Sequence, residues 1–343
     1  MIGDTPTSSV RSYLRLNTPS VFAKESRGRY VVQTTLASAL LRERSESRQG
    51  REPFRFGRAM LFHADCFDWL SQLAGNSVHA VVTDPPYGIH EYTPEQQAKL
   101  RDGKGGVWRI PPSFDGHVRS PLPRFTTLTG EQLGYIRTFF CLWGRLLLPK
   151  LVPGAHVLVA SNPLLSHLVS AALAESGLER RGEIIRLTMT MRGGDRPKSA
   201  HDVFPDVSVM PRSMWEPWVL YRKPIEGRVQ DNLRKWGTGG LRRPSEDKPF
   251  GDVIESAPTR SNERSLAPHP SLKPQAFLRK VVRAVLPLGR GVVLDPFAGA
   301  GSTLAAAEAV GYDSIGVEKD EFFFDMACKA IPRLTEFSPN GKP

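Results

Sequence analysis

Cysteine is scarce in this sequence, and long apolar runs are missing. The 343 residues include three cysteines, Cys66, Cys141 and Cys328, whose odd number and spacing match no disulfide framework or metal-binding pattern. Such usage is typical of a reducing, intracellular setting. The most apolar stretch, FFCLWGRLLLPKLVPGAHVLVA, is interrupted by charges and prolines, so it does not resemble a membrane span of about 20 apolar residues. The N-terminus has scattered arginines where a signal peptide would have an apolar block. We therefore expect a cytoplasmic protein with no membrane association and no metal site.

Positive charge is in excess. The chain has 46 Lys and Arg against 35 Asp and Glu, a net charge of +11. An excess of this size favours nucleic acid as a partner, with anionic lipid as the second choice, whereas the plain alternative is a generally basic, soluble surface. Residues 1–58 carry eleven of these cations and five acids and show little hydrophobic periodicity. We expect a partly disordered basic arm there, either solvated or in contact with phosphates.

From Ala59 onward, short apolar strand patterns alternate with amphipathic helix patterns. The strands are expected at 59–64, 77–84, 155–161, 183–191, 291–295 and 314–318. The helices are expected at 66–73, 130–148, 163–177, 274–289, 303–311 and 320–331, and the last should stop before Pro332. This alternation predicts an α/β fold with a mainly parallel sheet and helices on both of its faces.

Residues 192–265 interrupt the alternation. They are rich in Gly, Pro, Arg and Ser, and they contain four large aromatic residues: Trp215, Trp218, Tyr221 and Trp236. We interpret this stretch as a small lobe inserted into one domain made of residues 59–191 and 266–334, with residues 335–343 as a tail.

The segment VLDPFAGAGST, residues 293–303, forms a strand followed by a glycine-rich turn. Gly299 and Gly301 would let the backbone approach a ligand closely. The turn lacks the Gly-Lys-Ser/Thr of a phosphate loop and the full glycine spacing of a dinucleotide site. Glu318 ends the next strand, where an acid can bind both ribose hydroxyls, and Asp295 suits an ammonium group. S-adenosylmethionine has a ribose and an ammonium group, although a helix-capping turn with two solvated acids would look similar.

A second corner occurs at VVTDPPYGIH, residues 81–90. Prolines cannot extend strand hydrogen bonding, so the strand ends at Asp84 and is followed by Pro85, Pro86 and Tyr87. One acid, a stiff backbone and one aromatic ring are suited to holding a nucleobase, whereas an ordinary proline turn is the simpler interpretation.

Three motifs together resemble the DNA amino-methyltransferases that modify adenine N6 or cytosine N4. They are DPPYG at 84–88, HPSLKP at 269–274 and VLDPFAGAGST at 293–303, and their order is similar to that of the permuted beta group of this family. The serine and leucine of HPSLKP depart slightly from the commoner Thr-Gln form. The resemblance covers residues 59–334 and implies a Rossmann-like fold that uses S-adenosyl-L-methionine and releases S-adenosyl-L-homocysteine.

The resemblance also implies site residues. Asp84 and the Pro85 carbonyl would accept the two hydrogens of the target amine, next to Pro86, and Tyr87 would stack on a base extruded from the duplex. The remaining positions would bind the cofactor: Asp65 at its adenine, Glu318 at its ribose, Asp295, Phe297, Gly299, Gly301 and Ser302 around its methionine, and His269, Ser271 and Lys273 near its carboxylate.

Base choice and partners follow from the same resemblance. Aspartate before the prolines is typical of adenine-N6 enzymes and serine of cytosine-N4 enzymes, so adenine is favoured and cytosine is the alternative. Double-stranded DNA is the expected partner in a prokaryotic or phage-like cell, and a homodimer or a cognate restriction nuclease fits the family. A non-catalytic DNA-binding module and an RNA methyltransferase are weaker alternatives. Residues 192–265 correspond in position to a target-recognition region, whose candidate DNA contacts are Arg192, Arg196, Lys198, Arg242 and Arg243.

Overall fold

The computed structural model describes residues 22–26, 29–32, 51–86, 130–191, 196–197, 199–269 and 271–339. The chain divides into two compact units, Met1–Arg51 and Glu52–Pro343. The described part of the first unit is an antiparallel hairpin of β1 (Phe22–Ser26) and β2 (Arg29–Val32). The rest of the basic arm expected at 1–58 lies outside the described residues, except for its last residues, which begin the second unit.

The second unit is built on a nine-stranded sheet with the order β3-β4-β11-β10-β5-β6-β8-β7-β9. Its strands are β3 (Phe54–Phe56), β4 (Ala59–His63), β5 (Val78–Thr83), β6 (Leu151–Ala160), β7 (Glu179–Met191), β8 (Ser213–Arg222), β9 (Val253–Glu255), β10 (Val292–Asp295) and β11 (Asp313–Glu318). The central strands β4, β11, β10, β5 and β6 all run parallel. The predicted α/β fold with a mainly parallel sheet is therefore confirmed.

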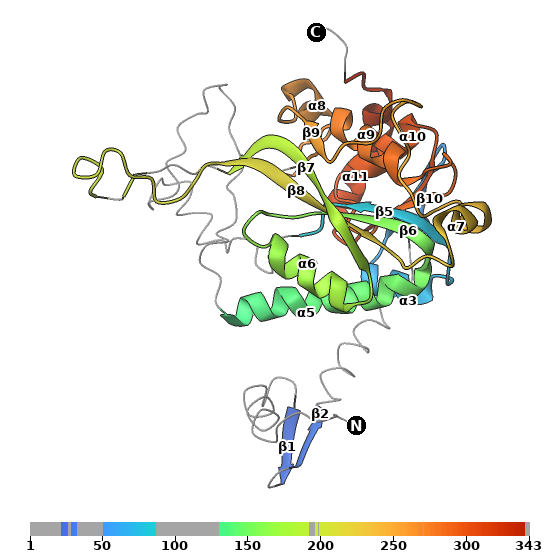
Figure 1. Cartoon of the computed structure of the whole chain (residues 1–343), viewed down its shortest axis with the longest axis horizontal. Coiled ribbons are helices and arrows are strands. Elements are labelled where there is room, and N and C mark those ends of the chain that lie inside the picture. The colour runs from blue at the N-terminus through green and yellow to red at the C-terminus, as the bar shows by residue number, and fades with distance from the viewer. Residues whose placement is uncertain are drawn as a thin grey trace. The chain divides into compact units, whose positions relative to one another are not determined.

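Helices cover both faces of this sheet (Figure 1). On one face lie α3 (Cys66–Gln72), α5 (Gly130–Leu147) and α6 (Ser166–Glu175); a 3-10 turn at Leu148–Lys150 follows α5. On the other lie α9 (Gln275–Val285) and α10 (Ser302–Ala309), with α11 (Glu321–Glu336) against α10. Within the described ranges, none of the helices combines the length and apolar character that a bilayer crossing requires.

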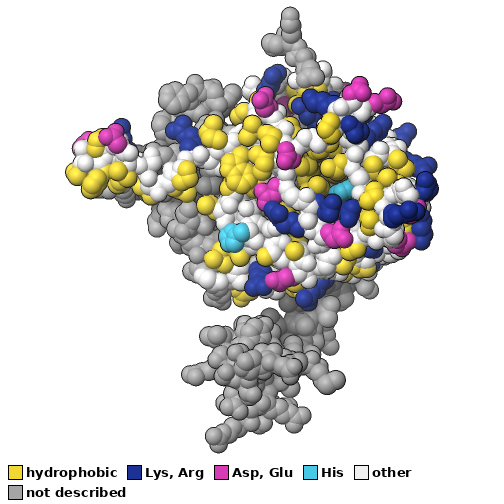
Figure 2. Space-filling view, viewed as in Figure 1, with side chains coloured by type: hydrophobic (Ala, Val, Ile, Leu, Met, Phe, Trp, Pro, Cys, Tyr) yellow, Lys and Arg dark blue, Asp and Glu magenta, His cyan; other side chains and the backbone are white. Residues whose placement is uncertain are grey.

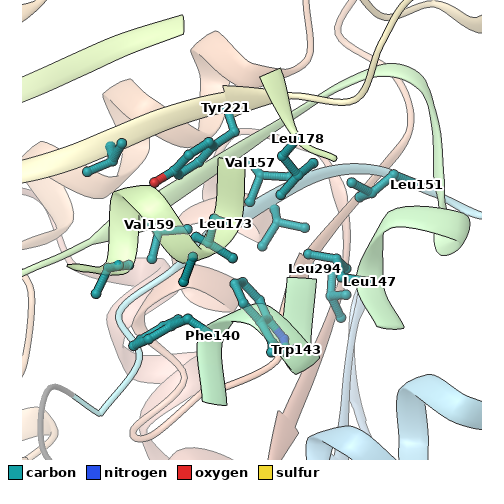
Figure 3. Close-up of a cluster of buried hydrophobic side chains, with 14 of the residues drawn as sticks. Phe140, Trp143, Leu147, Leu151, Val157, Val159, Leu173, Leu178, Tyr221 and Leu294 are labelled. Atoms are coloured by element: carbon teal, nitrogen blue, oxygen red, sulfur yellow. The ribbon is translucent and has the colours of Figure 1, made fainter. Parts of the chain in front are cut away.

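The alternation of side chains along the strands explains why both faces are covered. In β5, Val81 packs toward α5 and α6, whereas Ala80 and Val82 pack toward α9. Helix α5 contributes a stripe of fully or nearly fully buried residues that includes Phe140 and Trp143 (Figure 3). Because buried hydrophobic side chains pack against the central strands on both faces of the sheet, the ends of these strands are held in fixed positions.

The described residues of the 192–265 stretch do not form a separate lobe, contrary to the expectation from the sequence. Strand β8 lies inside the sheet between β6 and β7, and β9 pairs with β7. The helix α7 (Val229–Trp236) is attached to β6, because Asn232 donates to the Pro153 carbonyl at 2.9 Å. The fully buried Trp218 and Tyr221 pack on opposite faces of the sheet, which shows that the aromatic residues belong to its core.

Between β7 and β8 the polypeptide leaves the sheet in a short excursion. Its described residues 199–212 extend away from the body of the unit (Figure 1). Four apolar side chains on it are exposed, namely Val203, Phe204, Val207 and Val209. Because β7 runs parallel to β6, this excursion starts from the edge of the sheet where the parallel strands end.

Helix α11 does not stop before Pro332, contrary to the sequence-based expectation. It continues to Glu336 with the proline inside it. The chain beyond the proline is held by tertiary contacts: Leu334 is fully buried, and Arg279 donates to the carbonyls of Leu334, Thr335 and Phe337 at 2.8–3.0 Å. These contacts offset the backbone hydrogen bond that a proline removes.

Candidate active site

The two motif-bearing corners lie side by side at the carboxyl edge of the sheet. Strands β5 and β10 are parallel neighbours, so Asp84, which follows β5, and the turn that follows β10 are on the same edge. Thr83 Oγ1 donates to Asp295 Oδ1 at 2.7 Å, and both side chains are buried. Ligands of open parallel sheets bind at this edge.

Asp295 is tied into the glycine turn. Besides Thr83, its carboxylate accepts from the Phe297 amide at 3.2 Å and from the Thr303 side chain. Burial raises the pKa of Asp295 to about 6, against the lowering effect of these donors. The carboxylate therefore organises the turn, and its expected contact with a cofactor ammonium stays a prediction.

The glycine turn packs against the segment that contains His269. Gly299 and Gly301 have φ values of +51° and +75°, which a residue with a Cβ rarely adopts. A Cβ at Gly299 would lie 3.1 Å from His269 Nε2, so the structure brings these two motifs into contact. Burial and the nearby charge of Lys273 lower the pKa of His269 to about 4, so its ring is neutral at pH 7. The Ser271 amide donates to His269 Nδ1 at 3.2 Å, so Nδ1 is the acceptor and the proton of the neutral ring is on Nε2.

Two further acids lie along the same edge. Glu318, at the end of β11, accepts from the amides of Gly299 and Asp320, each at 2.8 Å. Burial raises its pKa above the ordinary value, although the amide donors oppose this effect. Asp65 follows the neighbouring strand β4 and caps α3, accepting from the Phe67 amide at 2.9 Å. Asp65, Glu318 and Asp295 therefore form a row at the ends of the neighbouring strands β4, β11 and β10.

An aromatic wall borders this row. Phe297 of the turn packs at 6.0 Å from Phe139 and at 5.6 Å from Trp143, both measured between ring centroids. A site with acids, a close backbone and an aromatic side chain is chemically suited to a nucleoside with a cationic amino acid tail. The first helical residue after the turn, Ser302, accepts a hydrogen bond from Gln275 at its carbonyl, at 2.8 Å.

Asp84 belongs to a buried chain of charges that the motifs do not reveal. Lys273 Nζ contacts Asp84 Oδ2 at 2.5 Å and Glu216 Oε1 at 3.2 Å. Glu216 Oε2 accepts from Arg186 Nη1 at 2.9 Å and from Trp218 Nε1 at 3.1 Å. Burial alone would lower the pKa of Lys273, but the two carboxylates raise it above its ordinary value.

Sequence reasoning missed Thr83, Arg186 and Glu216. The two charged residues had one available signal in the sequence: each has apolar neighbours on both sides, Ile185 and Leu187 for Arg186 and Trp215 and Pro217 for Glu216. A charge that is buried in such a stretch needs a partner. Sequence reasoning placed Lys273 near a cofactor carboxylate, whereas the structure places its ammonium group on Asp84 and Glu216.

Of the candidate DNA contacts that the structure describes, Arg242 and Arg243 lie away from this edge. Arg242 donates to the Tyr312 hydroxyl at 2.7 Å and its amide to the Ala284 carbonyl at 2.8 Å, so it and Arg243 lie where β11 begins, at the opposite edge of the sheet. Figure 2 shows Lys and Arg side chains gathered on that side of the molecule, around α7. Arg196 lies on the excursion, and Tyr87, Arg192 and Lys198 lie outside the described residues.

Comparison with known proteins decides the family. Residues 78–329, which contain all three motifs, match the family model described as DNA methylase, of the N6 and N4 type. The chain belongs to the DNA methylase family. The methylase is thus an S-adenosyl-L-methionine-dependent DNA amino-methyltransferase, and the sequence-based resemblance is confirmed.

Among the described residues, no group of three His, Cys, Asp or Glu side chains is arranged to hold a metal ion.

Individual relatives are similar to the methylase over different lengths. The Type II methyltransferase M.HindIII of Haemophilus influenzae is 23% identical over 296 residues, which are 79% of this chain and 94% of the relative. M.HinfI, a Type II methyltransferase of the same species, is 39% identical over 79 residues, 23% of this chain and 21% of the relative. M.ScaI of Streptomyces caespitosus, also Type II, is 36% identical over 86 residues, 25% of this chain and 27% of the relative.

Solved structures share the fold. A putative DNA modification methylase of Thermus thermophilus, crystallised with S-adenosyl-L-methionine, has a TM-score of 0.52 and 21% identity, covering 80% of this chain and 94% of that one. The cytosine-N4-specific PvuII DNA methyltransferase has a TM-score of 0.51 and 12% identity, covering 83% of this chain and 88% of that one. At these identities the likeness concerns the fold alone, and it does not tell an adenine enzyme from a cytosine enzyme.

Proposed function

We propose that the methylase transfers the methyl group of S-adenosyl-L-methionine to the N6 atom of an adenine extruded from double-stranded DNA. The observation that carries this proposal is the position of Asp84 and Pro85 directly beside the glycine turn, joined to it through Thr83 and Asp295. An acceptor for the amine and a site for the methyl donor thus lie on one edge of the sheet.

The cofactor would be held by residues that the edge already aligns. Bound S-adenosyl-L-methionine supplies an electrophilic methyl group on its sulfonium. Glu318 is placed to bind the ribose next to Gly299, and Asp65 to meet the adenine one strand away. The turn from Phe297 to Ser302 would surround the methionine part, and Asp295 and the 269–273 segment would bind its charged end. These assignments combine the observed neighbourhood with the family resemblance.

The protein's contribution to the chemistry is to reshape the amine. An exocyclic amino nitrogen is a poor nucleophile because its lone pair is delocalised into the ring. The Asp84 carboxylate and the Pro85 carbonyl would accept hydrogen bonds from its two hydrogens and favour a tetrahedral nitrogen, whose lone pair can attack the methyl group in line. The bond between the methyl carbon and the sulfur would break, S-adenosyl-L-homocysteine would leave, and the methylated nitrogen would lose one proton to the Asp84 carboxylate and from there to water. Proline fixes the backbone at this corner, so the acceptor carbonyl keeps one direction. Stacking on Tyr87 would offset the few kcal/mol that extrusion of a base costs.

Adenine is favoured over cytosine because aspartate is the first residue of the DPPY motif, and in the resembling enzymes aspartate accompanies adenine. Cytosine N4 is the second candidate, since both bases present a similar amino group. The beta-group assignment, a homodimer and a cognate nuclease remain predictions. The exposed excursion at 199–212 starts from the catalytic edge and is the best-placed described segment for target recognition.

Product analysis tests the proposal directly. The purified methylase is incubated with labelled S-adenosyl-L-methionine and mixed-sequence DNA or RNA, and the nucleosides are identified by mass spectrometry. N6-methyladenine in DNA is expected. N4-methylcytosine would shift the assignment to the second candidate, and methylated RNA alone would replace the proposed substrate.

A pair of variants tests the role of Asp84. Asp84→Asn removes a carboxylate at the catalytic edge and should abolish transfer while cofactor binding is retained. Asp313→Asn makes the same change at an exposed position where β11 begins, at the opposite edge, and should leave the rate unchanged. DNA binding with no methyl transfer by the unaltered protein would instead support a non-catalytic module.

A further inference from the structure

The buried charges around Asp84 form one continuous chain across the sheet. Arg186 of β7 and Glu216 of β8 are directly paired in the sheet register, and their side chains form an ion pair at 2.9 Å. Lys273 connects Glu216 to Asp84, which follows β5. Arg186, Glu216 and Lys273 are each less than 10% exposed. Charges of alternating sign therefore lead from the outer strands to the catalytic corner.

The Arg186 end of this series of charges is held by neutral partners. Arg186 Nε donates to Ser256 Oγ at 3.0 Å, and its Nη2 donates to the Ala257 carbonyl at 3.1 Å. The guanidinium carbon also lies 5.4 Å from the centroid of the Phe277 ring. Because buried charges are stable only when paired and hydrogen-bonded, these contacts place Glu216 with little freedom.

We propose that Glu216 is a positioning residue for methyl transfer, which holds the Lys273 ammonium so that it steadies the Asp84 carboxylate without withdrawing it from the target amine. Lys273 shares its donors between two carboxylates. Without the Glu216 carboxylate, the ammonium would be drawn more strongly to Asp84 and would compete with the amine for its oxygens. The inference rests on the proposed role of Asp84 and extends it to two strands outside the motifs.

The arrangement makes opposite predictions for two variants. Glu216→Gln leaves Lys273 and Arg186 with less negative charge nearby, so the pKa of Asp84 should fall. Lys273→Met removes the cation beside Asp84, so its pKa should rise. If transfer needs ionised Asp84, the acidic limb of the single-turnover rate should move to lower pH in the first variant and to higher pH in the second.

Other titratable groups near these four buried charges also affect the pH dependence of the methyl-transfer rate. Asp295 interacts with Asp84 across the β10 and β5 ends, and its own pKa is about 6. The charge of Lys273 lowers the pKa of His269. The charge of Arg186 lowers the pKa of Glu263, which lies in α8 (Ser261–Leu266), against the effect of burial. Opposite movements show that the limb belongs to a group that senses both charges, and Asp295 would respond in the same two directions. Thr83→Val, which removes a donor from Asp295, separates the two carboxyl groups, because the limb should stay in place in this variant if it belongs to Asp84.

The experiment measures single-turnover rates from pH 5 to 9 for the full-length protein, with cofactor affinity and thermal unfolding as folding checks. Glu216→Gln should lower the rate at pH 7.5 by about tenfold to a hundredfold, as a small misplacement of a reacting group does. Affinities for cofactor and DNA should change by less than about threefold, below the 1.4 kcal/mol that a tenfold change represents. Glu216→Asp, which keeps the charge, should recover part of the rate.

Glu179→Gln is the matched control. Glu179 and Arg222 also form an ion pair between β7 and β8, at 2.7 Å, but at the far end of the two strands and with more solvent exposure. This variant should keep the wild-type rate and pH profile, which separates a general loss of strand pairing from an effect on Asp84.

Three results overturn the inference. Wild-type rate and pH profile in Glu216→Gln, with Asp84→Asn inactive, would remove Glu216 from the mechanism and leave the proposed function intact. Full activity of Asp84→Asn would instead overturn the proposed function, and this inference with it. If Glu216→Gln does not fold, Glu216→Asp should still lose part of the rate and Lys273→Met should move the limb to higher pH; a wild-type rate in the first and an unmoved limb in the second would exclude the positioning role.

Discussion

Thr83 and Asp295 join the two halves of the active site through a buried 2.7 Å hydrogen bond. Thr83 directly precedes the corner that we propose to bind the base, and Asp295 begins the turn that we propose to bind the cofactor. Thr83 and Asp295 are 212 positions apart in the sequence. We therefore expect this bond to help set the distance between the donor and the acceptor of the methyl group.

Replacing Thr83 with valine should destabilise the protein in a pH-dependent way. The change keeps the shape but removes a donor to a buried carboxylate, which costs about 1–3 kcal/mol. The pKa of Asp295 is about 6 in the folded protein against an ordinary 3.8, and losing a donor should raise it further. A carboxyl group whose pKa is raised in the folded protein contributes stability that is fully present below its unfolded-state pKa and is lost as pH rises through its folded-state pKa. The loss of unfolding free energy caused by Thr83→Val should therefore be larger at pH 8, where Asp295 is ionised, than at pH 5.

Urea unfolding of wild type and Thr83→Val at the two pH values checks this expectation. Equal losses at pH 5 and pH 8 would show that the Asp295 carboxylate does not sense the threonine hydroxyl. A slower methyl transfer in the variant, with cofactor affinity little changed, is the accompanying functional expectation.

Glu318→Gln should weaken cofactor binding. The change removes the negative charge that we assign to the ribose, and hydrogen bonds to charged groups contribute about 1.5–3 kcal/mol, so the Kd should rise by roughly tenfold to a hundredfold. Isothermal titration with S-adenosyl-L-homocysteine measures it. Glu336→Gln, at the exposed end of α11, is the control and should bind as wild type does. An unaltered Kd in Glu318→Gln would move the ribose away from this residue.

Gly301→Ala and Gly311→Ala should differ in stability although both glycines have similar backbone angles. Their φ values are +75° and +79°, so each alanine carries a conformational penalty of about 1–2 kcal/mol. At Gly301 the new Cβ would also lie 2.5 Å from Ile331 Cγ1, whereas at Gly311 nothing lies within 4 Å. Chemical denaturation should therefore show a clearly larger loss for Gly301→Ala. Similar losses would mean that α11 moves away at no cost.

Strands and helices with clear apolar periodicity were predictable, since their pattern reflects which side chains meet the core. The stripe on α5 and the alternation along β5 and β6 are examples. Strand β8 was not recognised as part of the sheet, because Glu216 and Pro217 break its apolar pattern and because its partners β6 and β7 are distant in sequence. The end of α11 was misplaced because proline is a local signal, whereas Arg279 reaches the last carbonyls from another helix.

The sequence by itself determined the family, the order of strands and helices in the core, and the acids and glycines that mark the strand ends. These features are local, since a turn or a strand end needs particular residues at short spacing. Only the tertiary structure decided that Thr83 meets Asp295, that His269 rests on the glycine turn, and that Arg186, Glu216 and Lys273 lead to Asp84. Such pairings depend on which strands lie next to each other, and residue spacing along the chain carries no record of it.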